Sequence, residues 1–154
     1  MKIMELLQNS DIEKNVDRKD IYFQFEKLLI ELRKRELPDG IVISINKDIE
    51  ELNSTSVSGR ELRKKIAKTQ NRILNLLEKE VKLVTKNYYQ KIWLALGIAA
   101  FGVPLGVVLG TSLGNMAFLG IGLPIGLAIG IALGSGMDKK ALKEGRQLDI
   151  EIKY

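Results

Sequence analysis

The residue types that most often carry out catalysis are scarce in this sequence. It contains no histidine and no cysteine, so it cannot supply the ligands of a Cys/His zinc site, a Cys–His pair or a Ser–His–Asp triad. Carboxylates stand close together at Glu50 and Glu51 and at Glu78 and Glu80, where we expect solvated helix faces, although carboxylate acid–base chemistry stays open. No phosphate loop of the form GxxxxGKS or GxxxxGKT occurs. We therefore expect a protein that is not an enzyme and has no metal or cofactor.

A cluster of basic residues could instead bind an anionic ligand or a partner. Residues 60–91 contain 10 basic and 3 acidic residues, whereas residues 1–59 contain 9 basic and 12 acidic residues. Pairing with the acidic N-terminal segment is the simpler explanation, and the alternative is a nucleotide, an oligonucleotide or a cytoplasmic regulator protein. The candidate contacts are Arg60, Arg63, Lys64, Lys65, Lys68 and Arg72.

The elements that must position this cluster include a long uncharged run. Residues 92–137 are 46 residues without Asp, Glu, Lys or Arg. A bilayer core needs roughly 20 apolar helical residues per crossing, so the length fits two spans and a turn. The polar cluster TSLGN at 111–115 divides the run into predicted transmembrane helices at 92–110 and 116–136. The alternative, a buried hairpin in a soluble core, is disfavoured because the charged remainder could not cover two helices that are apolar all round.

Flanking charge predicts the orientation. Basic residues precede the first span and follow the second, whereas the turn carries none, so the positive-inside rule places both termini in the cytoplasm. Aromatic rings next to the first span suit the headgroup layer. The expected membrane-interface anchors are Tyr88, Tyr89, Lys91, Trp93, Lys139 and Lys140.

Glycines recur every fourth residue in both spans. GVPLGVVLGTSLG (residues 102–114) aligns with GLPIGLAIGIALG (residues 122–134) at a shift of 20, which matches four glycines and the proline. Small residues at this spacing let helix backbones approach closely in lipid. We expect two packing seams and a homo-oligomer, with a monomeric hairpin that uses both rows as the alternative. The seam residues are Gly102, Gly106, Gly110, Gly114, Gly122, Gly126, Gly130 and Gly134.

The two prolines, Pro104 and Pro124, occupy matching positions of the repeat. Each removes one backbone hydrogen bond, which predicts either a kinked gate in a pore or a bend that is compensated locally.

The remaining chain is expected to be helical. Residues 1–57 form an N-terminal cytoplasmic helical region with a capping box at 10–13, a turn at Leu37-Pro38-Asp39-Gly40 and a strand-like IVISI at 41–45. Residues 58–91 form a long basic juxtamembrane helix that starts at a Ser58–Glu61 capping box. Because no proline or glycine lies between Arg60 and Leu96, this helix is predicted to continue into the first span. Residues 138–154 form a cytoplasmic basic tail.

Residues 122–150, GLPIGLAIGIALGSGMDKKALKEGRQLDI, resemble the small bacterial glycine-zipper membrane proteins, in which a glycine-striped helix pair ends in a DKKA-type basic tail. The likeness covers about the last 60 residues, and it implies an all-α membrane protein of the bacterial inner membrane. The architecture is also similar to that of membrane effectors in bacterial anti-phage defence. Together these likenesses suggest a homo-oligomeric channel or pore, gated or restrained through its cytoplasmic helices by a partner or anionic ligand. The alternative is a non-conducting scaffold that anchors a partner protein at the membrane.

Overall fold

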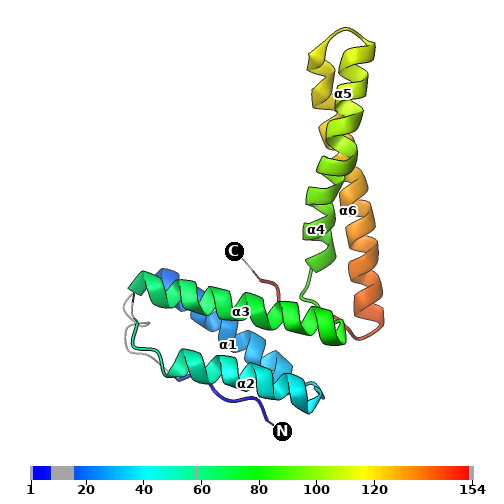
Figure 1. Cartoon of the computed structure of the whole chain (residues 1–154). Helices are drawn as coiled ribbons and strands as arrows, with labels where there is room; N and C mark the ends of the chain where they lie inside the picture. Colours follow the sequence, from blue (N-terminus) through cyan, green and yellow to red (C-terminus); the bar gives the residue numbers. More distant parts are fainter. Residues whose placement is uncertain (1, 8–15, 58, 153–154) are drawn as a thin grey trace. The chain divides into compact units, whose positions relative to one another are not determined.

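The structure, a computed structural model, describes residues 2–7, 16–57 and 59–152. Every regular element in these ranges is a helix, which confirms the predicted all-helical fold. The chain divides into two compact units, shown in Figure 1: an N-terminal unit of residues 1–84 and 148–154, and a hairpin unit of residues 85–147. The predicted capping box at 10–13 lies outside the described residues. Ser58, the first residue of the second predicted capping box, also lies outside them.

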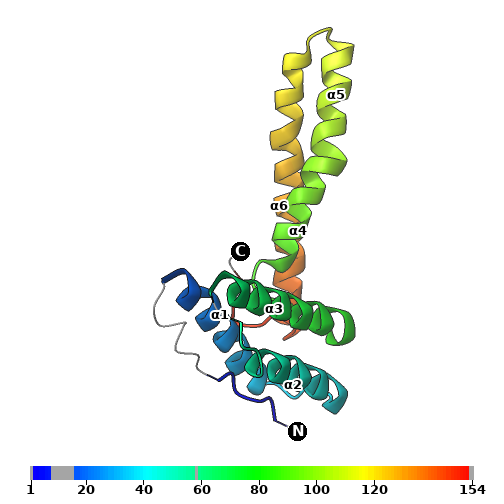
Figure 2. The same ribbon diagram turned by 60° about the vertical axis from the view of Figure 1, so that its left-hand side comes forward.

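The N-terminal unit is built on α1 (Val16–Arg33), α2 (Asp39–Asn53) and α3 (Gly59–Val81). Apolar residues three or four apart on each helix face one shared core. Helix α3 packs against both α1 and α2 (Figure 2). The fully buried side chains of these helices are Phe25, Leu28, Leu29, Leu32, Ile45, Ile49, Ile73 and Leu77.

The segment IVISI is helical, so the strand-like interpretation is wrong. It lies in the first turns of α2, which begins directly after Pro38. Ile41, Val42, Ile45 and Ile49 are buried, and their spacing of one, three and four residues is that of one helix face. The β-branched residues favour strands locally, but burial of this face against α3 decides the conformation.

Two extended segments complete the core of the N-terminal unit. Residues 2–7 are held by two amide side chains of α2, each of which binds the backbone of the segment at two points. The Asn46 Oδ1 accepts from the Met4 N–H at 2.8 Å and its Nδ2 donates to the Lys2 carbonyl at 3.0 Å. Asn53, two turns later on the same helix, makes the equivalent pair of bonds further along the segment.

The second extended segment comes from the C-terminus, which was predicted to be a basic tail. Helix α6 instead continues to Lys143, and the alternate residues Leu148, Ile150 and Ile152 are buried in the N-terminal core. Period-two burial is the signature of an extended chain with one buried face. The residues after the hairpin are therefore part of the folded N-terminal unit.

The prediction of one helix from residue 60 into the first span is wrong. Helix α3 ends at Val81, and α4 begins at Tyr88. Lys82 and Asn87 both have left-handed backbone conformations, with φ of 56° and 58°. Between them Val84 is buried, and its carbonyl accepts the Leu148 N–H at 2.8 Å. This contact with a distant part of the chain replaces the helical bonds that the local sequence would have allowed.

The hairpin unit contains the apolar run. Its first arm comprises α4 (Tyr88–Gly97), a π-helical turn η1 (Ile98–Gly102) and α5 (Val103–Ser112). Its second arm comprises a short 3-10 turn η2 (Met116–Phe118) and α6 (Leu119–Lys143). Within the described residues, two helices are long and apolar enough to cross a membrane, Tyr88–Ser112 and Met116–Lys143, as expected from the sequence.

The two prolines affect the backbone differently. Before Pro104 the helix widens to the π form, in which the Val103 N–H bonds to the Ile98 carbonyl five residues back. Such a turn absorbs the hydrogen bond that proline cannot make. Around Pro124 the α-helix continues without a change of type.

The turn between the arms is closed by a Schellman motif. Gly114 has φ of 66°, the Asn115 N–H bonds to the Gly110 carbonyl at 3.0 Å and the Gly114 N–H to the Thr111 carbonyl at 3.4 Å. This is the residue position at which a helix end favours glycine. The Asn115 side chain then caps η2 by accepting the Ala117 N–H at 2.9 Å.

Candidate functional site

The glycine rows of the two arms lie against each other within one chain. All eight glycines of the contact are buried although they sit on helices whose other faces are exposed. They are Gly97, Gly102, Gly106, Gly110, Gly122, Gly126, Gly130 and Gly134. Gly110 meets the start of the second arm, where an added methyl group would lie 3.3 Å from the Met116 Cα. The second row, which the sequence left available for a neighbouring subunit, is therefore occupied by the first arm.

The contact is between backbones. A methyl group placed on Gly126 would lie 2.5 Å from both the Gly97 carbonyl oxygen and the Gly102 nitrogen. A methyl group on Gly122 would meet the Gly102 carbonyl oxygen and would lie 2.6 Å from the Gly106 Cα. Real Cβ atoms essentially never approach other atoms this closely, so only glycine fits these positions. In lipid, close contact of this kind replaces the hydrophobic effect as the source of helix association.

Towards the charged end of the hairpin, where Lys91, Lys139 and Lys140 lie, the α6 glycines also pack against residues of α4 that are not glycines. A methyl group on Gly134 would lie 2.5 Å from the Gln90 Cα, and one on Gly130 would meet the Trp93 carbonyl. The sequence alignment missed Gly97, which has no counterpart in the 20-residue repeat. It also misassigned Gly114, whose added methyl group would meet nothing within 4 Å and whose role is the turn.

Asp138 continues the α6 glycine row by one further step of four residues. It is 6 % exposed, and its carboxylate accepts the Tyr89 N–H at 3.1 Å and the Gln90 N–H at 2.9 Å. These are two of the donors that the start of α4 leaves without helical partners, and Asn87 in the cap position forms no side-chain cap. A carboxylate at a helix N-terminus also interacts favourably with the helix dipole, by up to about 2 kcal/mol when partly buried.

The sequence analysis places Asp138 in the basic tail. Its position four residues after Gly134 is a signal that could have identified it as part of the contact between the helices. The close approach that the glycines permit brings its short side chain to the first turn of α4.

The same contact places the predicted interface anchors of both arms at one end of the hairpin. Tyr88 and Tyr89 are half-buried and stack edge to face, with ring centroids 5.2 Å apart, whereas Lys139 and Lys140 are exposed.

The basic cluster of α3 separates into two groups, and the first group is paired. The Arg72 guanidinium donates to both carboxylate oxygens of Asp48, with Nε–Oδ2 at 2.9 Å and Nη2–Oδ1 at 2.6 Å. This hydrogen bonding is the main cause of a raised pKa for Arg72. Lys65 pairs with Glu51 at 3.6 Å. Lys65, Lys68 and Arg72 line one hollow of about 350 Å³ between α2 and α3. Arg72 and Lys65 therefore pair with carboxylates of the acidic N-terminal segment, which is the simpler of the two explanations.

The second group lies in the first turns of α3. Arg60, Arg63 and Lys64 line a groove of about 960 Å³ between α1 and α3. Lys64 pairs with Glu61 one turn away at 3.0 Å. In the part of the chain that the structure describes, no carboxylate pairs with Arg60 or Arg63. Arg72 and Lys65 are thus paired with carboxylates of α2, whereas Arg60 and Arg63 have no carboxylate partner among the described residues.

Within residues 2–7, 16–57 and 59–152, no group of three or more acidic, histidine or cysteine side chains could hold a metal ion. Comparison of the chain with protein-family models, curated proteins and solved structures found no match in any of the three. The class that the fold itself defines is an all-helical protein with a glycine-packed pair of apolar helices of membrane-spanning length.

Proposed function

We propose that this protein is a two-span protein of the bacterial inner membrane, with both termini cytoplasmic, whose hairpin anchors a helical binding unit at the membrane surface. The observation that carries the proposal is the contact between the two glycine rows inside one chain. It makes the hairpin a self-sufficient membrane body that needs no second subunit to satisfy its close-packing faces. The basic and aromatic residues at its charged end support a cytoplasmic location for that end.

Three observations favour this membrane anchor over the channel that the sequence suggests. Backbones that touch along the glycine rows leave no room for a water path between the arms of one hairpin. The outward faces carry large apolar side chains, including Leu96, Val108 and Ile121, which are 47 %, 58 % and 47 % exposed and suit lipid. The helix that the sequence predicts from residue 60 into the first span is also interrupted between α3 and α4, so no continuous helix joins the basic cluster to the first span.

A cysteine-labelling experiment tests the proposed topology, and the absence of native cysteines makes the background clean. Leu113→Cys places a thiol at the turn, and Lys47→Cys places one on the exposed side of α2. In spheroplasts a membrane-impermeant maleimide should label Leu113→Cys at once and Lys47→Cys only after lysis. Labelling of Lys47→Cys from outside, or protection of Leu113→Cys before and after lysis, would contradict the proposal.

One observation favours the channel as a second candidate. Gly120 and Gly136 on α6 have nothing within 4 Å of an added methyl group. With Pro124, Ala128 and Ala132 they form an exposed stripe of small residues at a spacing of four. This stripe lies on the face opposite the glycine row and could pack against a second copy.

The two candidates differ in what happens to the membrane potential. If self-association through the stripe forms a pore, expression should depolarise cells, and Ala128→Leu should abolish the effect. An anchor should leave the potential unchanged in both cases. Substitutions at Gly106 or Gly126 cannot separate the candidates, because they disturb the hairpin itself.

A further inference from the structure

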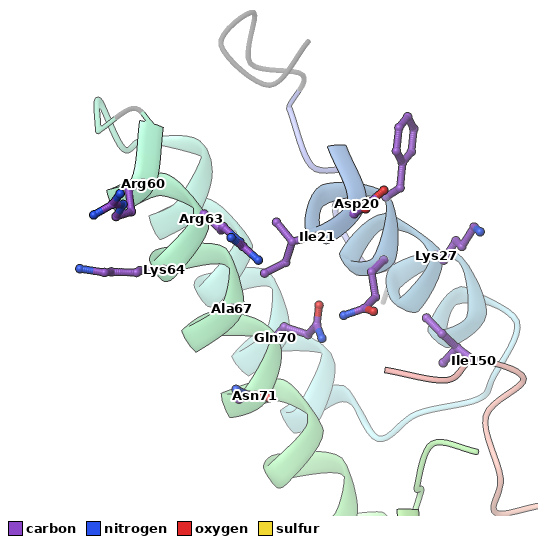
Figure 3. A pocket seen from close by; sticks show the side chains of 12 residues that line it. Asp20, Ile21, Lys27, Arg60, Arg63, Lys64, Ala67, Gln70, Asn71 and Ile150 are labelled. Atoms are coloured by element: carbon purple, nitrogen blue, oxygen red, sulfur yellow. The ribbon is translucent and has the colours of Figure 1, made fainter. Parts of the chain in front are cut away.

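The groove between α1 and α3 contains a buried polar atom without a partner. Gln70 is 2 % exposed, yet within the described residues no donor reaches its Oε1. Figure 3 shows the Gln70 side chain extending from α3 towards α1, into the space that the groove occupies. A buried acceptor without a hydrogen bond destabilises a fold. A ligand that brings a donor into the groove would supply the missing bond.

The charge of the groove favours an anion. Arg63 points into the groove near Ile21, whereas Arg60 and Lys64 extend from the outer side of the same helix (Figure 3). Lys27 also lines it, and Asp20 is the only carboxylate among the lining residues that the structure describes. Arg63, unlike Arg72, has no carboxylate partner in the described ranges. A guanidinium in this state is suited to bind phosphate through paired hydrogen bonds.

The remaining walls are apolar or carry amides. Ile21, Ala67 and Ile150 supply flat apolar surface, and Gln24 and Asn71 add further polar groups. A volume of about 960 Å³ lies within the range of small-molecule sites, roughly 300–1,000 Å³. Arg63 and Gln70 are two turns apart on α3, about 10 Å along its axis. This separation matches a ligand with a phosphate at one end and a planar hydrogen-bonding group at the other.

We propose that this groove binds a nucleoside phosphate whose base carries an exocyclic amino group, with the amino group donating to Gln70 Oε1 and the phosphates bound by Arg63. Adenine is the representative base, since its amino group donates where the 6-oxo group of hypoxanthine can only accept. The inference deepens the proposed function, on which it rests for a cytoplasmic location. The groove lies entirely within the N-terminal unit, so binding can be measured without reference to the membrane.

Calorimetric titration of the full chain in detergent micelles tests the proposal with three probes. ADP should bind, IDP should bind at least tenfold more weakly, and pyrophosphate should also bind at least tenfold more weakly than ADP. The comparison of ADP with IDP uses the unaltered protein and so does not depend on any variant folding. Equal binding of ADP and IDP, or of ADP and pyrophosphate, would overturn the assignment, as would no binding of ADP.

Three variants locate the site. Gln70→Leu should lose at least tenfold in ADP affinity while the protein unfolds at a higher temperature, because the variant removes the unpartnered acceptor. Arg63→Gln should lose at least tenfold in ADP affinity and make the remaining binding less sensitive to salt. Lys79→Gln, on the same helix but outside the groove, should bind like the unaltered protein. ADP binding that survives Gln70→Leu would show that the nucleotide binds elsewhere. The labelling experiment on topology can fail or succeed independently of these results.

Discussion

Replacing Gly126 with alanine tests the contact between the glycine rows most directly. The added methyl group would lie 2.5 Å from the Gly97 carbonyl oxygen and 2.6 Å from the Gly102 Cα. Ordinary contacts between such atoms are about 3.5–4.0 Å, so the arms must separate by about 1 Å. Because both neighbours are backbone atoms, no side chain can rotate to make room. Overpacking of this kind costs about 1–3 kcal/mol.

Gly120→Ala is the matched control on the same helix. An added methyl group there meets nothing within 4 Å, and both variants exchange glycine for alanine, which by itself stabilises a helix by about 1 kcal/mol or less. The packing cost, about 1–3 kcal/mol, falls on Gly126→Ala only. We expect Gly126→Ala to unfold at a lower fraction of sodium dodecyl sulfate in mixed micelles than Gly120→Ala.

The fluorescence of Trp93 reports this unfolding, because it is the only tryptophan in the sequence and its backbone lies against Gly130 of α6. Both variants should retain the far-ultraviolet circular dichroism of a helical protein before sodium dodecyl sulfate is added. Equal midpoints for the two variants, or a higher midpoint for Gly126→Ala, would refute the contact between the glycine rows.

Three further predictions concern the polar end of the hairpin and the N-terminal unit. Asp138→Asn should destabilise the hairpin by about 1–2 kcal/mol in the same micelle assay, because the amide replaces one of the two accepting oxygens with an NH2 group, which cannot accept an N–H at the start of α4; an unchanged midpoint would contradict the cap. Leu148→Ala should cost about 2–5 kcal/mol in thermal unfolding of the N-terminal unit, since Leu148 is fully buried, whereas Leu142→Ala, at a position that is 61 % exposed, should change stability by less than about 0.5 kcal/mol. The hydrogen bond from Lys34 is the main cause of a lowered pKa for Glu31, so the group stabilises the fold above its unfolded pKa of about 4.3 and loses this contribution as the pH falls through the lower folded value. Acid titration of Glu31→Gln should therefore show a smaller loss of stability below about pH 4 than the unaltered protein, and parallel curves would disprove the assignment.

Local patterns in the sequence determined the class of fold. The uncharged run, its polar interruption and the apolar spacing of three and four residues each depend on neighbours within a few turns, so they indicate helices and two apolar arms directly. Glycine at every fourth position is equally local, because it marks one face of one helix. The cationic character of α3 follows from composition alone.

Only the tertiary structure decided which partner each of these faces has. The α6 row packs on the first arm of the same chain, and Asp138 reaches the start of α4. Arg72 finds Asp48 on α2, while Arg63 is left facing a groove. Val84 bonds to Leu148, which ends the helix that the local sequence would continue. In each case the deciding contact joins residues of different segments of the chain, and no periodic pattern within one helix carries information about what lies across from it.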